Sequence, residues 1–161
     1  MFGNAYAGSA SGSALEMISF KVEGQEYCLD IKDILEIRGW TAPTPIAHAP
    51  AYVKGVISLR GVVMPVIDLA ARLTHSGLTG CDRNVIIVVQ APFGQMGLMV
   101  EAVCDNMVVD RSVVQAAPAA SGGSAPDFVQ GFLALEGRMV TLLNLDSLVP
   151  NEAVQMAMAA A

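Results

Sequence analysis

One pattern occurs twice, 76 residues apart: VKGVISLRGVVMPVIDL at residues 53–69 and VQGFLALEGRMVTLLNL at residues 129–145. In each copy an apolar strand leads to a glycine-containing turn, a second apolar strand, and a polar residue ahead of a leucine. A tight hairpin turn often needs glycine because its backbone has a positive φ. The identical positions are Val53 and Val129, Gly55 and Gly131, Leu59 and Leu135, Gly61 and Gly137, and Leu69 and Leu145. The repeat predicts a duplicated β-hairpin, each followed by a possible helical turn that Asp68 or Asn144 caps.

Short strands are also expected outside the two copies. Their alternating or continuous apolar residues, bounded by turn signals, are typical of strands. The expected strands are 17–22, 25–30, 53–59, 62–68, 84–90, 95–103, 106–109, 129–135 and 139–144, with a short amphipathic segment at 33–38 and helical turns at 69–73 and 145–149. We therefore predict an all-β fold with few short helices. A duplicated unit makes this two similar small barrels that share an interface, because each alone has a thin core.

The composition fits a folded domain and excludes several functions. The chain has 161 residues, of which 53% are hydrophobic and 15% charged, unlike a disordered chain. Its net charge of −6 argues against non-specific nucleic-acid binding and against docking on anionic membranes. No apolar run approaches the ~20 residues that span a bilayer, and the first residues lack the features of a signal peptide. We expect a cytoplasmic protein without direct membrane insertion.

Low-complexity segments suggest the limits of the folded part. We expect a flexible tail at 1–15, one domain with two barrel subdomains at 16–150, and a C-terminal tail at 151–161. Residues 75–82 are expected to form a polar loop and residues 115–126 a mobile loop. The three cysteines contain no Cys-x-x-Cys pair, so neither a disulfide framework nor a zinc site is indicated, and we expect them to be buried thiols.

The sequence offers little for catalysis. It contains no phosphate-binding loop, no dinucleotide-binding glycine motif and no nucleophile elbow. The two histidines are not at a metal-ligand spacing, and the acidic pairs at 30 and 33 and at 101 and 105 are expected to face solvent. We therefore predict no catalytic residue, no cofactor and no metal. A small-molecule-binding barrel would need a polar pocket, which the sequence does not indicate.

Apolar strands and one arginine favour protein binding instead. Strands that are apolar on both faces can bury one face in a barrel and the other against a partner. Arg60 lies at a predicted hairpin tip with no acid beside it in the sequence. It is either a solvated loop cation or an anchor for a partner carboxylate. The nine methionines either fill cores or form adaptable partner surfaces.

A longer set of residues resembles the CheW family, the adaptor proteins of bacterial chemotaxis. It comprises EIRGW at 36–40, Ile46, Pro50, VKGVISLRG at 53–61 and PVIDL at 65–69, and the likeness runs from about residue 17 to 149. The resemblance implies two small, intertwined, five-stranded SH3-like barrels packed side by side, without enzymatic activity or a cofactor. It also implies that the chain couples the cytoplasmic tips of chemoreceptors to the histidine kinase CheA, through the regulatory domain of the kinase. Other CheW copies are further partners in rings beneath membrane-associated receptor arrays.

The resemblance also assigns residues to partners by motif position. The kinase-binding set is Ile34, Glu36, Lys54 and Gly55. The receptor-binding set is Leu59, Arg60, Val85, Ile87, Gly97 and Val103. Apolar strands along a groove would hold one face of a helical receptor tip, and Arg60 would anchor a carboxylate or carbonyl of that helix.

The sequence departs from the family pattern at two places. Ala70 and Ala71 stand where family members often carry a charge, and Asn144 replaces an acid in the second copy. These departures concern the choice of partner. They leave open an alternative, a CheW-like adaptor of a non-motility or divergent signalling pathway with a different kinase or receptor partner.

Overall fold

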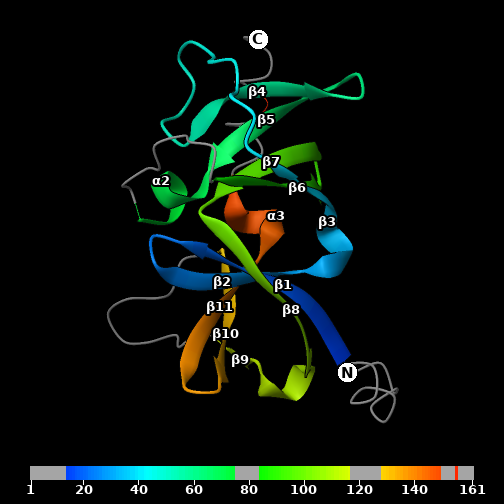
Figure 1. The fold of residues 1–161 in the computed structure, drawn as a ribbon, viewed down its shortest axis with the longest axis vertical. Helices are drawn as coiled ribbons and strands as arrows, with labels where there is room; N and C mark the ends of the chain where they lie inside the picture. The colour runs from blue at the N-terminus through cyan, green and yellow to red at the C-terminus, as the bar shows by residue number, and fades with distance from the viewer. Residues whose placement is uncertain (1–13, 75–83, 117–127, 150–154, 156–161) are drawn as a thin grey trace.

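The structure is a computed structural model that describes residues 14–74, 84–116, 128–149 and residue 155. Its strands form two sheets, which lie one above the other with a short helix between them (Figure 1). We call them the middle sheet, built from the continuous segment 34–100, and the terminal sheet, built from 14–30 and 102–143. Residues 14 and 15 of the tail expected at 1–15 belong to a strand, and the rest of that tail lies outside the described residues. The tail expected at 151–161 apart from residue 155, the loop at 75–82 and most of the loop at 115–126 also lie outside them.

The two sheets have related strand orders. The middle sheet runs β3-β6-β7-β5-β4, and the terminal sheet runs β8-β1-β2-β11-β10-β9. The middle strands are β3 (Ile34–Gly39), β4 (Val53–Leu59), β5 (Val62–Asp68), β6 (Val85–Ala91) and β7 (Gly94–Val100). The terminal strands are β1 (Ala14–Val22), β2 (Gln25–Asp30), β8 (Ala102–Asp110), β9 (Gln115–Ala116), β10 (Val129–Leu135) and β11 (Arg138–Leu143). The helical turns are η1 (Ile31–Asp33), α2 (Leu69–Thr74), η2 (Arg111–Val113) and α3 (Leu145–Leu148).

The duplicated hairpin is confirmed in the pairing of its strands. Each hairpin contains one register shift at the same place, and each second strand pairs in parallel with one further strand, β5 with β7 and β11 with β2. The corresponding pairs are Val53–Ile67 and Gly55–Val66 in the first hairpin, and Val129–Leu143 and Gly131–Leu142 in the second. The 76-residue repeat of the sequence is therefore a repeat of strand register.

The polar residue after each hairpin caps a helical turn, as expected. Asp68 Oδ1 accepts hydrogen bonds from the backbone nitrogens of Ala70 and Ala71 at 3.0 and 3.3 Å. Asn144 Oδ1 accepts one from the backbone nitrogen of Asp146 at 3.1 Å. A short polar side chain serves here because it satisfies N–H groups that the first helical turn leaves without partners.

One glycine in each hairpin allows another segment of the chain to pass close to it. The segment after β3 forms a bridge between Thr44 and Val56, and a Cβ on Gly55 would collide with the Thr44 carbonyl. In the terminal sheet β9 crosses β10 in the same way, and a Cβ on Gly131 would lie 2.7 Å from the Gln115 carbonyl oxygen. In both sheets, the chain that follows one edge strand thus pairs with the opposite edge strand.

Three apolar clusters hold the sheets together. A central cluster takes side chains from both sheets and both α helices, including Phe20, Ile87, Leu69 and Leu145. One smaller cluster lies within the terminal sheet around Leu133, and another lies within the middle sheet around Met64. The central cluster buries residues from both ends and the middle of the chain. We call each sheet with the α helix that follows its hairpin one half of the molecule, and neither half has a complete core of its own.

Some sequence expectations differ from the structure. The segment at 33–38 is mainly a strand, β3, and the expected strand at 95–103 is two strands separated at Glu101. The chain changes sheets at that residue, where the Glu101 nitrogen donates to the Lys21 carbonyl at 2.9 Å. The middle sheet has the five strands expected, whereas the terminal sheet adds the two-residue β9 to five longer strands. The mostly β architecture with few short helices is confirmed.

The expectation of buried cysteines is confirmed for one residue and wrong for another. Cys28 is buried as expected, but Cys104 is exposed because it lies on a solvent-facing stretch of β8. Cys81 lies outside the described residues. In the part of the chain that the structure describes, no helix is long and apolar enough to cross a membrane.

Candidate partner-binding site

The tip of the first hairpin carries an exposed ion pair. Arg60 adopts a left-handed backbone conformation with φ of 52° ahead of Gly61, and this conformation makes the tight turn between β4 and β5. Its Nη1 donates to Glu36 Oε1 at 2.6 Å, and Glu36 lies on the edge strand β3. The second oxygen of Glu36 accepts from Arg38 Nη1 at 3.3 Å. One carboxylate therefore bridges two guanidinium groups at the end of the middle sheet.

This arrangement changes the proton affinity of both partners. The hydrogen bond from Arg60, with the charges of Arg60 and Arg38, holds the pKa of the Glu36 carboxyl below its usual value. The same bond raises the pKa of Arg60. Both residues thus keep their charges over the physiological range and are suited to charge-assisted contacts.

Exposed apolar side chains adjoin the pair in sequence on β3 and β5, and on β3 they alternate with Glu36 and so face the other side of the strand. Leu35 and Ile37, on the neighbouring positions of β3, are 49% and 42% exposed, and Val62 and Val63 of β5 are 41% and 50% exposed. Large apolar side chains rimmed by charge are typical of protein-binding surfaces. We call Leu35–Ile37 with Arg60–Val63 the tip surface.

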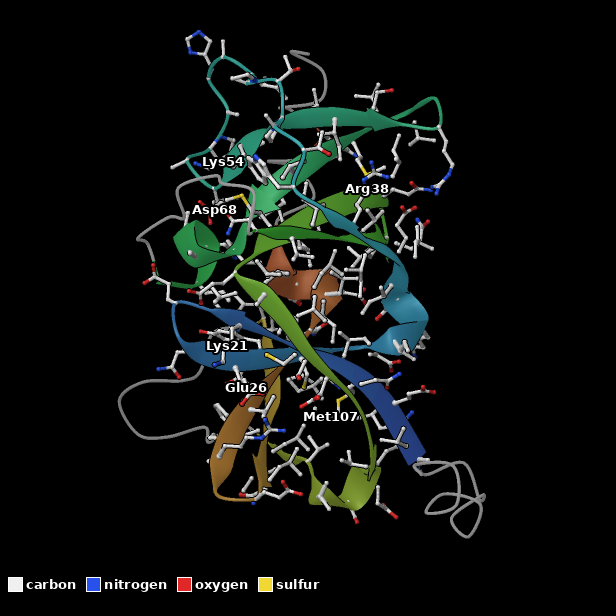
Figure 2. The ribbon with its side chains drawn as sticks, in the orientation of Figure 1. Lys21, Glu26, Arg38, Lys54, Asp68 and Met107 are labelled. Atoms are coloured by element: carbon white, nitrogen blue, oxygen red, sulfur yellow. The ribbon has the colours of Figure 1, made fainter. Side chains whose placement is uncertain are left out.

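Lys54 and Gly55 lie elsewhere on β4 and make structural contacts. Figure 2 shows Lys54 directed toward Asp68, and its Nζ lies 3.8 Å from Asp68 Oδ2. Asp68 is only 1% exposed, so Lys54 offsets the charge of a buried carboxylate that caps α2. Gly55 is buried beneath the Thr44 backbone. Lys54 keeps an exposed part, whereas Gly55 acts by allowing the close crossing.

Two residues assigned to different partners occupy equivalent places. Ile34 pairs with Val89 beside the register shift of β3, and Val103 pairs with Phe20 beside the register shift of β8. Both are half-buried against the central cluster. Ile34 of the kinase set and Val103 of the receptor set therefore occupy corresponding positions in the strand pairing of the two sheets.

The other receptor-set residues lie mostly inside the middle sheet. Ile87 has no exposed surface, and a Cβ on Gly97 would lie 2.9 Å from Ile86 Cγ2. Val85 and Leu59 are half-buried against apolar clusters. Within the receptor set, Arg60 is the only exposed side chain. The structure places it against Glu36 of the kinase set and not against Val85, Ile87 or Gly97.

The terminal sheet has a related arrangement that sequence reasoning missed. Asp105 follows Val103 as Glu36 follows Ile34, and Arg138 lies 3.7 Å from Asp105 and 3.1 Å from Glu26. A surface pocket of about 360 Å³ lies among Asp105–Val109, Leu135, Glu136 and Arg138. The repeat was the available signal, because Glu136 occupies the position of Arg60 and Arg138 follows it by two residues.

Among the described residues, the structure contains neither a cluster of metal-ligating side chains nor an activated thiol at Cys28. No group of three or more His, Cys, Asp or Glu side chains in residues 14–74, 84–116 and 128–149 is placed to hold a metal ion. Burial raises the pKa of the Cys28 thiol to about 12, so this group is not an activated nucleophile. Its Sγ instead packs at 3.5 Å from Met17 Sδ.

A family model described as the CheW-like domain matches residues 16–153. The chain belongs to the CheW family. Among curated proteins, chemotaxis protein CheW of Rhizobium meliloti is 46% identical over 137 residues, covering 85% of this chain and 88% of the relative. Chemotaxis protein CheW of Klebsiella aerogenes is 34% identical, covering 85% and 82%.

A solved CheW structure has the same fold. The crystal structure of scaffolding protein TtCheW from Thermoanaerobacter tengcongensis superposes with a TM-score of 0.75 at 28% identity, covering 83% of this chain and 91% of that one. As a CheW-family member, the chain is a non-enzymatic adaptor of chemotaxis. None of these relatives favours an adaptor of another signalling pathway.

Proposed function

We propose that this CheW-family chain couples chemoreceptors to CheA by using the tip surface as one of its docking sites. The observation that carries the proposal is the Glu36–Arg60 ion pair at the hairpin tip, with exposed apolar side chains at the neighbouring positions of β3 and β5. Charged groups at the edge of an apolar patch give orientation and specificity, and the patch supplies burial. The partners in this proposal are the regulatory domain of the kinase and the cytoplasmic tip of a receptor.

Membership of the family supports the assignment of the two residue sets, and burial divides their roles. Glu36, Arg60 and the exposed part of Lys54 are the direct contacts in this proposal. Ile34, Leu59, Val85 and Val103 supply partly buried apolar support beside them. Ile87 and Gly97 act beneath the surface, because changes at either position would move the neighbouring strands.

The proposal includes a place in the cell and an assembly. The chain is cytoplasmic and is recruited to membrane-associated arrays through its receptor contact, and other CheW copies or kinase regulatory domains are its neighbours in rings. Individually weak contacts suffice for such an assembly, because a partner held at one site has a high effective concentration at the next.

The test is a pair of titrations followed by the backbone amide shifts of isotope-labelled chain. The CheA regulatory domain should shift β3 and β4 at residues 34–36 and 54–55. A receptor-tip fragment should shift Arg60 and the strands at 85–103. Unshifted spectra with both fragments at high concentration would refute the proposed coupling.

Substitutions then separate the ion pair from the partner contact. We expect Arg60→Glu to weaken binding of the receptor tip by about tenfold, as for a charged contact worth about 1.4 kcal/mol. The matched control is Arg111→Glu in η2, an exposed arginine outside the tip surface with the same change in charge. The double variant Glu36→Arg with Arg60→Glu restores the pair but not the partner contact, so recovered affinity would show that the pair acts only within the chain.

A further inference from the structure

One arginine joins the two halves of the repeat at the side of the α helices. Arg72, in α2, donates from Nε to the Leu148 carbonyl of α3 at 2.6 Å. Its guanidinium carbon lies 4.9 Å from the centroid of the Phe128 ring and 5.5 Å from that of Tyr52. Stacking on two rings and one hydrogen bond together hold the guanidinium in a single orientation.

The partners of Arg72 are related by the repeat. Tyr52 and Phe128 are 76 residues apart, directly before the first strand of each hairpin. Their carbonyls accept equivalent hydrogen bonds of 2.7 Å from Asp68 and Asn144. Leu148 itself stands 76 residues after Arg72. The Arg72 guanidinium therefore contacts corresponding aromatic rings of both copies. The second copy has Leu148 at the position of Arg72, so it has no second cation there.

This contact differs in kind from the rest of the boundary between the halves. The central cluster is apolar, and apolar contact is non-directional. Between the described residues of the two halves, the other hydrogen bonds involve Glu101, where the chain passes from the middle to the terminal sheet. Arg72 supplies a directional contact at a different place, between α2 and α3. Figure 1 shows these two helices at the level between the sheets.

We propose that Arg72 is a positioning residue that fixes the orientation of the middle sheet relative to the terminal sheet. Without it, the apolar cluster keeps the halves together but allows α2 to move against α3. Buried or half-buried polar contacts can select one arrangement among several that apolar packing permits. The inference does not depend on the proposed partners, since it concerns the free chain.

The test measures orientation by residual dipolar couplings of backbone amides in a weakly aligned sample. In the unmodified chain, couplings from both sheets should fit one alignment tensor. In Arg72→Met each sheet should still fit a tensor by itself, but the two tensors should differ. Arg72→Lys keeps a cation over the rings and loses the guanidinium geometry, so an intermediate difference is expected and this variant serves if the first does not fold.

The matched control is Arg138→Met. Arg138 also pairs with two groups, Glu26 and Asp105, but all three belong to the terminal sheet. This variant should lower stability while both sheets continue to fit one tensor. The inference is overturned if Arg72→Met and Arg72→Lys both retain a single tensor, or if Arg138→Met separates the tensors as much as Arg72→Met does.

Discussion

At the scale of the residue, the tip surface depends on a contact that sequence separation hides. Glu36 and Arg60 are 24 residues apart and lie on opposite sides of the strand order, yet the tip of the β4–β5 hairpin reaches the edge strand β3. The resemblance to CheW assigned them to different partners, whereas the free chain pairs them. A partner that approaches either residue therefore meets both, and binding at one must use or break the pair.

The ion pair predicts an acid-side pH dependence. Because the hydrogen bond from Arg60 lowers the pKa of Glu36, the pair stabilises the fold above the pKa of an unfolded glutamate, about 4.3. This contribution is lost as the pH falls through the lower folded pKa. A carboxyl-detected NMR titration should show a Glu36 midpoint below the ordinary value of a glutamate carboxyl, and this midpoint should rise toward that value in Arg60→Met.

Asp33 is the internal comparison for that titration. Its pKa is raised by partial burial and by the neighbouring charge of Asp30, so its midpoint should lie above the ordinary value in both proteins. An unchanged Glu36 midpoint in Arg60→Met, with Asp33 also unchanged, would mean that the pair does not form in solution.

At the scale of the element, the two hairpins were predictable because their signals are local. Alternating apolar residues, Gly61 and Gly137 in the turns, and the caps Asp68 and Asn144 all lie within each 17-residue copy. The bounds of β4 and β5 accordingly match the expected strands. The division at Glu101 was not predictable, because it depends on a hydrogen bond to Lys21, 80 residues earlier. The position of Arg72 was not predictable either, because the two aromatic rings that it contacts come from both halves.

The glycines at the hairpin crossings predict a graded loss of stability. Gly131→Ala places a methyl group 2.7 Å from the Gln115 carbonyl oxygen and 2.8 Å from Val114 Cγ1, which should cost about 1–3 kcal/mol of unfolding free energy. Gly55→Ala should cost more, because it adds a disfavoured φ of 150° to its collision with Thr44. Urea unfolding measures both values.

Gly39→Ala is the matched control for these crossings. Gly39 ends β3, and a methyl group there would meet no atom within 4 Å. Its unfolding free energy should change by no more than about 0.5 kcal/mol. A Gly131→Ala protein as stable as Gly39→Ala would contradict the close crossing of β9 over β10.

At the scale of the whole molecule, the order of the segments determines how the chain must fold. The middle sheet is one continuous segment inserted between β2 and β8 of the terminal sheet. The terminal sheet can therefore form only when the two ends of the chain meet across the inserted segment. Its residues Phe20 and Leu143 enter the same cluster as Ile67 and Leu98 of the middle sheet. Each half thus completes the core of the other.

This sharing predicts a single cooperative unfolding transition. Trp40 packs against the middle-sheet cluster and reports on that half, and a dye on the exposed Cys104 of β8, in a chain with Cys81→Ser, reports on the terminal sheet. Both signals should change at the same urea concentration. Leu142→Ala, in the terminal-sheet cluster, should lower the unfolding free energy by about 2–5 kcal/mol and shift both signals equally, because loss of one half exposes the central cluster of the other. If the Cys104 signal shifts and the Trp40 signal does not, the middle sheet is stable by itself. The two halves would then unfold as independent units.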